Sequence, residues 1–158
     1  MAIFPQYDVK ERTELRDLSV PILQGRVVVF GTAESLKGKH KWPDGFYGSR
    51  VGLNTGFDPA VLGGVLFAEA IKSGRIRLRE ANSSERNLRK LVRGRIDFYL
   101  NDRMTGVEGY PGVVLGQVTT VNEGHIGYTT LQSKFAHLVP FVTALDSVIV
   151  ELRQSGGN

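Results

Sequence analysis

The sequence predicts an α/β protein with a largely parallel sheet. Short β-branched runs bounded by glycine alternate along the chain with segments whose apolar residues recur at helical spacing. This alternation is typical of strand–helix–strand units, which build parallel sheets. With 158 residues, of which 41% are hydrophobic, the chain can form one domain or two small lobes.

The first half of the chain contains two predicted strands and one predicted helix. Residues 25–32 and 50–56 are apolar runs bounded by glycine, and they indicate buried strands. Residues 37–49 break every periodic pattern with glycine, proline and aromatic residues, and they predict a loop. Asp58, a favoured N-cap residue, precedes a proline and predicts a helix over residues 59–72.

The middle of the chain is rich in arginine. Residues 75–81 alternate apolar residues with arginine and predict a strand at a sheet edge. Asn82 and Glu85 have the spacing of a capping box, which predicts a helix that ends near Gly94. The basic residues of this helix lie opposite its leucines, so we interpret them as a solvated face.

The last third predicts three strands and a helix. Residues 96–100, 112–121 and 125–130 are the strand candidates. Residues 139–157 carry apolar residues at helical spacing before two glycines, and they predict a C-terminal amphipathic helix.

The composition argues against several functions. The formal charge of +4 arises from 20 basic and 16 acidic residues, and it indicates no nucleic-acid partner. The absence of cysteine excludes disulfides, thiolate catalysis and Cys-ligated metals. Residues 1–12 lack the pattern of a signal peptide, and the apolar residues 60–71 are too few to span a membrane.

Motifs for catalysis or metal binding fail on spacing. In residues 31–39 six residues separate two glycines, where a phosphate-binding loop needs four. Ser49 is not flanked as in a hydrolase nucleophile elbow. His40, His125 and His137 show no metal-ligand spacing. We therefore expect no metal, no cofactor and no catalytic residue.

Two predicted strand ends carry groups suited to a ligand. In parallel α/β sheets, ligands bind beyond the carboxyl ends of the strands. Residues 54–58 lead from a strand into a helix start, which favours an anion, and Asp102 follows another strand and offers a charge to a cation. Together they would suit a zwitterion such as an amino acid. Taken alone, Asp102 is equally well explained as a turn or cap residue.

The order of several motifs resembles a known family. "ERTELRDLSVPI", "VGLNTG", "LVRGRIDFYLND" and "FVTALDSVIVELRQSG" occur in this sequence in the order and spacing of similar segments in the amino-acid-type extracellular solute-binding proteins, family 3, of bacterial ABC transporters. The resemblance implies a type II periplasmic-binding-protein-like fold. It also implies a periplasmic location, a membrane permease as partner and a small-molecule ligand, an amino acid or a related carboxylate.

The resemblance also implies site residues. Arg12 matches the arginine that holds the ligand carboxylate, and Asp102 matches the aspartate that holds the ammonium group. Gly56, Phe57 and Asp58 match the loop at a helix start, although relatives often carry Ser or Thr where this chain has Asp58. A planar guanidinium can bind a carboxylate through two hydrogen bonds, which explains an arginine at such a site.

The chain begins after the first strand–helix units of such a protein, so the resemblance implies one complete lobe plus a partial first lobe. Residues 1–32 would be partial lobe one with the first hinge strand, and residues 33–122 would be lobe two. Residues 123–158 would be the second hinge strand and a helix that returns to lobe one. Incomplete cover of lobe one would favour a homo-oligomer.

Two other functions remain open. The first is a dehydratase-like enzyme on the same fold, for which Glu11, Glu14 and Asp102 are the candidate acids or bases. The second is a sensor or degenerate fragment that no longer binds solute.

Overall fold

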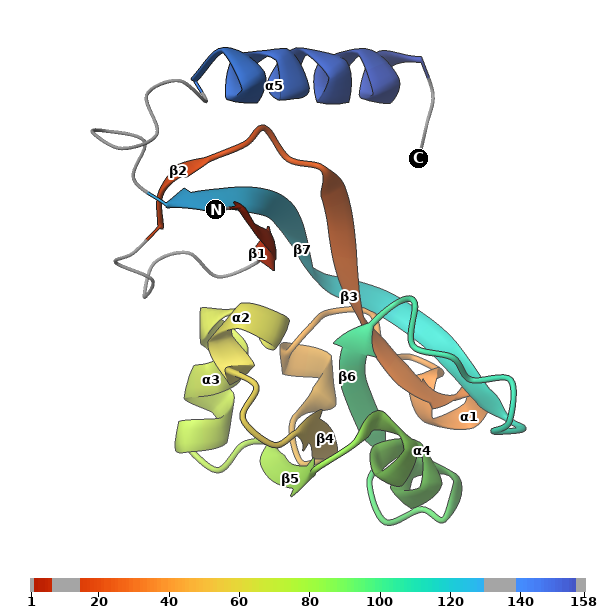
Figure 1. Cartoon of the computed structure of the whole chain (residues 1–158). Helices are drawn as coiled ribbons and strands as arrows, with labels where there is room; N and C mark the ends of the chain where they lie inside the picture. Colours follow the sequence, from red (N-terminus) through yellow and green to blue (C-terminus); the bar gives the residue numbers. More distant parts are fainter. Residues whose placement is uncertain (1, 7–14, 130–138, 156–158) are drawn as a thin grey trace. The chain divides into compact units, whose positions relative to one another are not determined.

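The computed structural model describes residues 2–6, 15–129 and 139–155 of the chain (Figure 1). The chain forms two compact units: Met1–Gly25 with Asn122–Asn158 make up unit one, and Arg26–Val121 make up unit two. Strands β3 (Leu23–Thr32) and β7 (Val113–Thr129) carry the chain from one unit to the other.

Unit two contains a mixed sheet with the strand order β3–β6–β4–β5. Its other strands are β4 (Arg50–Asn54), β5 (Arg77–Ala81) and β6 (Phe98–Asp102). β4 pairs in parallel with β5 and β6, whereas β3 pairs antiparallel with β6. β4, β5 and β6 run parallel as predicted, whereas β3, which brings the chain in from unit one, runs opposite to β6.

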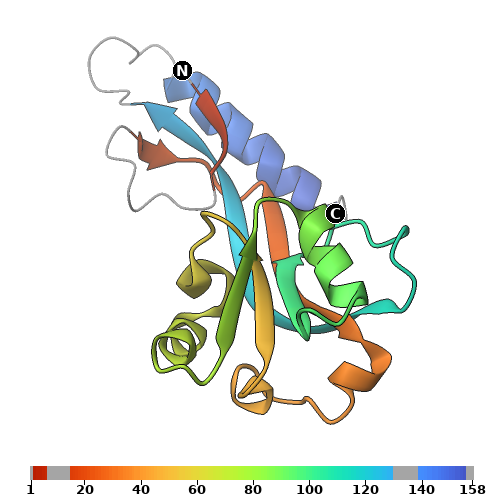
Figure 2. The same ribbon diagram turned by 90° about the horizontal axis from the view of Figure 1, so that it is seen from below.

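Helices cover both faces of this sheet (Figure 2). α2 (Pro59–Gly63) and α3 (Val65–Lys72) pack on one face, where the core includes Phe46, Leu53, Phe67, Phe98 and Leu100. α4 (Ser84–Val92) packs on the other face, where the core includes Phe30, Leu88, Leu91, Ile96 and Tyr99. Alternate strand residues point to opposite faces, so the apolar runs of β3 and β6 supply both cores.

The helix predicted over residues 59–72 is broken into α2 and α3. Asp58 caps α2 and Pro59 is its first residue, as predicted. Gly64 then adopts φ 83° and ψ 165°, a conformation that ends α2 and that only glycine adopts easily. The ring of Phe67 packs against Gly63, where a Cβ would lie 2.2 Å from Cδ1 of Phe67. The break therefore brings Phe67 into the core.

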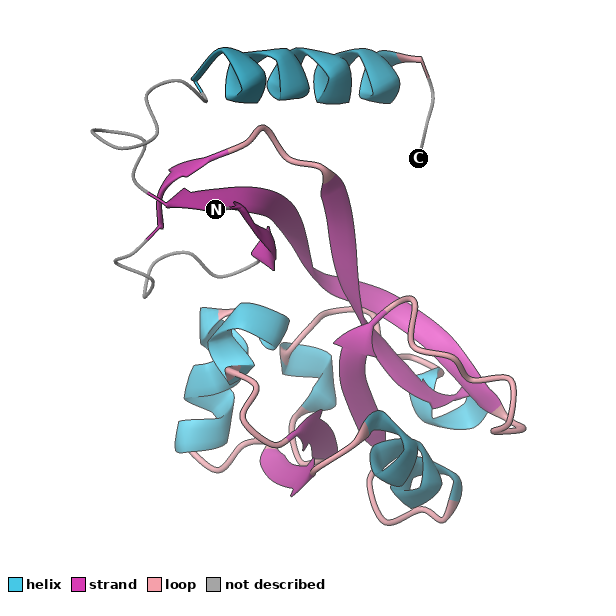
Figure 3. Cartoon of the chain, viewed as in Figure 1, coloured by secondary structure: helices cyan, strands magenta, loops and turns pink. Residues whose placement is uncertain are grey.

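The segment predicted as a loop contains one short 3-10 helix, η1 (Asp44–Phe46), and the short helix α1 (Ala33–Leu36) lies just before it (Figure 3). The indole Nε1–H of Trp42 donates to the carbonyl oxygen of Gly63 at 2.8 Å and satisfies an orphan carbonyl at the end of α2. The Trp42 ring also contacts Phe46 and Phe67, with ring centroids 4.9 and 4.8 Å apart. The loop is thus anchored to the core.

The N-cap of α4 lies one residue after the predicted cap, Asn82. The side chain of Ser83, and not Asn82, accepts a hydrogen bond from the backbone N–H of Arg86. Asn82 is exposed and its predicted capping box with Glu85 is absent from the hydrogen bonds of this helix. Serine and asparagine are both good N-caps, so the sequence could not decide between neighbouring candidates.

Unit one contains strands β1 (Ala2–Gln6) and β2 (Leu15–Leu18), both antiparallel to β7, and the helix α5 (Val139–Gln154). The two strands predicted over residues 112–121 and 125–130 form one continuous strand, β7, which ends at Thr129. Its backbone stays extended through Gly124, whose carbonyl oxygen accepts from the N–H of Ile22 at 2.8 Å. None of the described helices is long and apolar enough to cross a membrane.

Candidate functional site

The candidate site lies at the carboxyl edge of β4 and β6. These strands are parallel, with Val51 opposite Phe98 and Gly52 opposite Tyr99, so both end at the same edge of the sheet. The loop from Asn54 to Asp58 follows β4, and Asp102 is the last residue of β6. Asp102 continues the alternation of Phe98 and Leu100, so it belongs to the face covered by α2. The sheet thus brings Asp102 and the start of α2 to one edge and one face.

The loop between β4 and α2 is shaped by Gly56 and closed by Asp58. Gly56 has φ 86°, and the N–H of Phe57 donates to the carbonyl oxygen of Asn54 at 3.1 Å. The exposed Asp58 accepts from the N–H of Ala60 through Oδ1 at 2.7 Å. Its carboxylate is therefore engaged at the first turn of α2. Phe57 is 44% exposed beside it.

Asp102 is half-buried and shapes the turn that leaves β6. Its Oδ1 accepts from the N–H of Met104 at 2.7 Å, and its carbonyl oxygen accepts from the N–H of Thr105 at 2.9 Å. No described basic side chain forms an ion pair with Asp102. Asp102 therefore stabilises this turn through Oδ1. Its other carboxylate oxygen, Oδ2, remains available for a ligand.

A buried polar cluster lies at the same edge on the opposite face, and the sequence analysis missed it. Its members come from β4, α4 and β6: Asn54, Ser84, Asn87, Tyr99 and Asn101. The Tyr99 hydroxyl donates to Oδ1 of Asn54 at 3.1 Å and accepts from Nδ2 of Asn101 at 2.6 Å. Asn101 also donates to Oγ of Ser84 at 2.9 Å. The polar alternation of Tyr99 and Asn101 in β6 was the signal available in the sequence.

Asn87 connects this cluster to the backbone of β4. Its side chain is fully buried, and Nδ2 donates to the carbonyl oxygen of Leu53 at 2.8 Å and to Oδ1 of Asn54 at 3.0 Å. Burial raises the pKa of Tyr99, while its hydrogen bonds with neighbouring side chains oppose this shift. The phenol therefore stays neutral, and the cluster supports the edge without adding charge.

Solved structures with the same architecture were found for this chain, whereas no family model and no curated protein sequence matches it. A mutant of ArgBP from T. maritima is 22% identical, with a TM-score of 0.62, over 99% of this chain and 62% of that one. AbpA from Streptococcus pneumoniae, an amino acid ABC transporter substrate-binding protein bound to L-arginine, is 16% identical, with a TM-score of 0.61, over 95% and 60%. The chain has a type II periplasmic-binding-protein fold.

The fold prediction is thereby confirmed, and this chain spans less than two thirds of the length of these solute-binding proteins. Another protein with this fold is the ancestral amino-acid-binding protein AncCDT-1, described as a precursor of cyclohexadienyl dehydratase. It is 13% identical, with a TM-score of 0.61, over 96% of this chain and 62% of that one.

Not every predicted residue of a solute-binding site can be located. Arg12, together with the alternative acids Glu11 and Glu14, lies outside the described residues. Gly56, Phe57, Asp58 and Asp102 lie at one edge of unit two, as set out above. In the part of the chain that the structure describes, no three His, Asp or Glu side chains converge as metal ligands would.

Proposed function

We propose that this chain binds a small polar solute, an amino acid or a related carboxylate, as the substrate-binding component of an ABC transporter. The observation that carries the proposal is the convergence of Asp102 and the Gly56–Asp58 loop at one edge and face of the unit-two sheet. Ligands of α/β folds bind at this kind of edge. The proposed location is the periplasm and the proposed partner is a membrane permease.

In this proposal Asp102 binds the ammonium group of the ligand, and Arg12 binds its carboxylate. Gly56 and Phe57 provide the wall of the site, and Asp58 keeps α2 in place through its bond to Ala60. Because Asp58 already holds the first turn of α2, the carboxylate of the ligand depends on Arg12 and not on this helix start. A bidentate arginine contact is strong enough for that task.

The proposed mechanism is closure of two lobes around the solute. Residues 33–122 would be lobe two, residues 1–32 would contribute part of lobe one and the first hinge strand, and residues 123–158 would contribute the second. A ligand that contacts both lobes favours the closed state by its greater affinity for it. The arginine-bound state of AbpA supports L-arginine as the first ligand to test.

An enzyme on this fold is the second candidate, and its support is the AncCDT-1 description as a dehydratase precursor. In that case a small carboxylate would be consumed and not simply released. The protein is incubated with L-arginine, other amino acids and small carboxylates, and the mixture is then examined by mass spectrometry. Loss of a compound indicates turnover, whereas its recovery unchanged is consistent with binding alone. A fragment or sensor that no longer binds would give neither result.

The decisive experiment is a thermal-shift titration with L-arginine and L-glutamate on wild type and Asp102→Asn. A ligand present at 100 times its Kd stabilises the folded state by about 2.7 kcal/mol, which for this chain length raises Tm by roughly 5–10 °C. Asparagine retains an acceptor for the N–H of Met104, so the turn should survive while the ligand-induced shift is lost.

Glu69→Gln is the matched control, because it removes one exposed carboxylate from α3 and leaves the candidate site intact. Equal ligand-induced shifts in wild type, Asp102→Asn and the control would remove Asp102 from the site. A lower Tm without ligand in Asp102→Asn alone, with normal ligand shifts, would assign Asp102 to the turn only.

Self-association is also part of the proposal. α5 exposes apolar side chains, among them Phe141 at 63% and Leu152 at 59%. Such a helix face gains stability when a second copy covers it. Light scattering over a concentration series should detect a homo-oligomer, and a monomer at every concentration would contradict this.

A further inference from the structure

A concentrated basic surface lies on unit two, on the face of the sheet opposite to Asp102 and α2. Nine of the 20 lysines and arginines fall within residues 72–95, with two of the 16 acidic residues. This segment therefore carries a net charge of +7, while the rest of the chain carries −3. The sequence analysis interpreted its helix as an ordinary solvated face. The structure shows that this helix shares its surface with a neighbouring strand.

The sheet register places arginines of β5 on the same side as α4. Arg77 and Arg79 lie opposite Arg50 and Gly52 of β4. A Cβ on Gly52 would meet the side chain of Asn87 of α4, so this is the α4 side of the sheet. Leu78 points to the other side, into the core under α2 and α3. Arg77 and Arg79 are both exposed.

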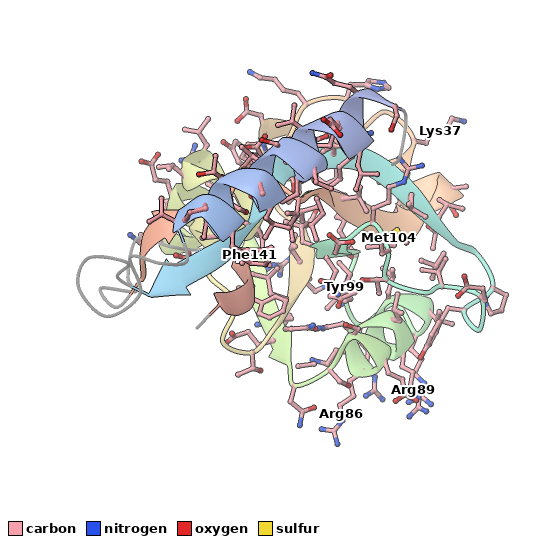
Figure 4. The ribbon with its side chains drawn as sticks, turned by 45° about the horizontal axis from the view of Figure 1, so that its top comes forward. Lys37, Arg86, Arg89, Tyr99, Met104 and Phe141 are labelled. Atoms are coloured by element: carbon pink, nitrogen blue, oxygen red, sulfur yellow. The ribbon has the colours of Figure 1, made fainter. Side chains whose placement is uncertain are left out.

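α4 and its C-cap Arg93 add four basic residues to this surface. At 3.6 residues per turn, Arg86, Arg89, Lys90 and Arg93 fall within an arc of about 100°. Figure 4 shows Arg86 and Arg89 projecting from α4 at the periphery of the unit. Nζ of Lys90 donates to the carbonyl oxygen of Glu80 in β5 at 2.7 Å, which confirms that helix and strand adjoin here. The basic face is defined as Arg77, Arg79, Arg86, Arg89, Lys90 and Arg93.

Most of the charges of the basic face have no carboxylate partner in the part of the chain that the structure describes. Among the described residues, only Arg89 has a carboxylate partner, Glu85. Arg86 and Lys90 are like charges four residues apart within α4, an arrangement that destabilises the helix. Protection of a sheet edge explains arginines on β5, but it does not explain those on α4.

The chemistry of the basic face indicates phosphate groups on an extended surface. Five of its six residues are arginines, whose guanidinium groups bind phosphate oxygens through two hydrogen bonds. Neither α4 nor β5 carries an aromatic residue on which a nucleic-acid base could stack. Each lysine or arginine close to an anionic membrane surface contributes about 1 kcal/mol of attraction. We propose that the basic face binds the headgroups of an anionic phospholipid membrane.

The test is co-sedimentation of the full chain with vesicles of phosphatidylcholine alone or mixed with phosphatidylglycerol. Wild type should bind only the anionic vesicles, and binding should vanish at high salt. Arg86→Gln combined with Arg93→Gln removes two charges from the basic face. At about 1 kcal/mol for each charge, the partition coefficient should fall roughly thirtyfold.

The matched control combines Lys37→Gln with Lys72→Gln, which removes two charges elsewhere in unit two. Both lysines are exposed; Lys37 lies far from Arg86 and Arg89 in Figure 4, and Lys72 belongs to α3 on the other side of the sheet. This control should bind nearly as wild type. The proposal is overturned if both double variants lose the same affinity for anionic vesicles, or if neither variant loses any. It is also overturned if vesicle binding persists at high salt, or if the chain binds duplex DNA but no vesicle.

Discussion

Replacing Tyr99 by phenylalanine removes a single oxygen from the buried polar cluster. The ring is fully buried and tilts against Phe30, with centroids 5.8 Å apart, and phenylalanine retains that contact. The hydroxyl makes two hydrogen bonds, to Asn54 and from Asn101. The variant therefore isolates the contribution of these two bonds.

The expected cost is small because both partners have a second bond. Oδ1 of Asn54 still accepts from Nδ2 of Asn87 at 3.0 Å, and Nδ2 of Asn101 still donates to Oγ of Ser84 at 2.9 Å. Neither partner of the lost hydroxyl is then left without a hydrogen bond, and each lost bond has a net value of about 0.5–1.5 kcal/mol. Since removal of the hydroxyl also relieves its desolvation, we expect a total loss of about 1–2 kcal/mol.

The assay is urea unfolding followed by circular dichroism and by the fluorescence of Trp42, the single tryptophan of the chain. Asn87→Asp provides the contrast, because a carboxylate there replaces both N–H donors at a fully buried site and should cost roughly 3 kcal/mol or more. A loss of that size for Tyr99→Phe would refute the redundancy of the cluster. An unchanged free energy of unfolding would show that the hydroxyl makes no useful bond.

Three further predictions concern stability. Arg50, through a hydrogen-bonded ion pair at 2.6 Å, holds the pKa of Asp97 below its usual range. The resulting stabilisation is present above about pH 4 and is lost as the pH falls through the lowered pKa, so the gap in urea midpoint between wild type and Asp97→Asn should close toward low pH. Gly64→Ala should cost about 1–3 kcal/mol in urea unfolding because of its backbone conformation, whereas Gly109→Ala, with open space around it, should change little. Arg86→Gln relieves the like-charge pair with Lys90 and removes a cation from the first turn of α4, so it should raise the free energy of unfolding in urea by about 0.2–0.5 kcal/mol; an unchanged or lower value would contradict this.

The sequence predicted which segments are regular better than how they pair. Valine-rich β3 and apolar β6 were found because β-branched runs favour strands, but composition does not report strand direction, so the antiparallel β3–β6 pair was missed. Gly64 lies within the apolar residues 60–71, and the pattern of that run did not show that Gly64 would adopt φ 83° and end α2.

The approach of residues 54–58 to Asp102 was also predictable from local signals. Residues 54–58 and Asp102 carry local signals, a helix cap and a polar strand end, and parallel pairing of β4 with β6 is enough to bring them to one edge. The cluster around Tyr99 was not predicted, because its members come from three segments whose proximity depends on the pairing of β4 and β6 and on the packing of α4. A hydrogen-bond partner distant in sequence leaves no local pattern.

Unit two is a single uninterrupted stretch of chain, whereas unit one is assembled from both ends of the sequence. The stretch begins in β3 and ends in β7, which are neighbouring strands, and the hydroxyl of Thr119 donates to the carbonyl oxygen of Val27 at 3.3 Å near its two ends. A segment with its own core and adjacent ends is suited to excision, to circular permutation through a short linker, or to transplantation into a surface loop of another protein. Residues 26–121 can thus be moved as one unit in protein engineering.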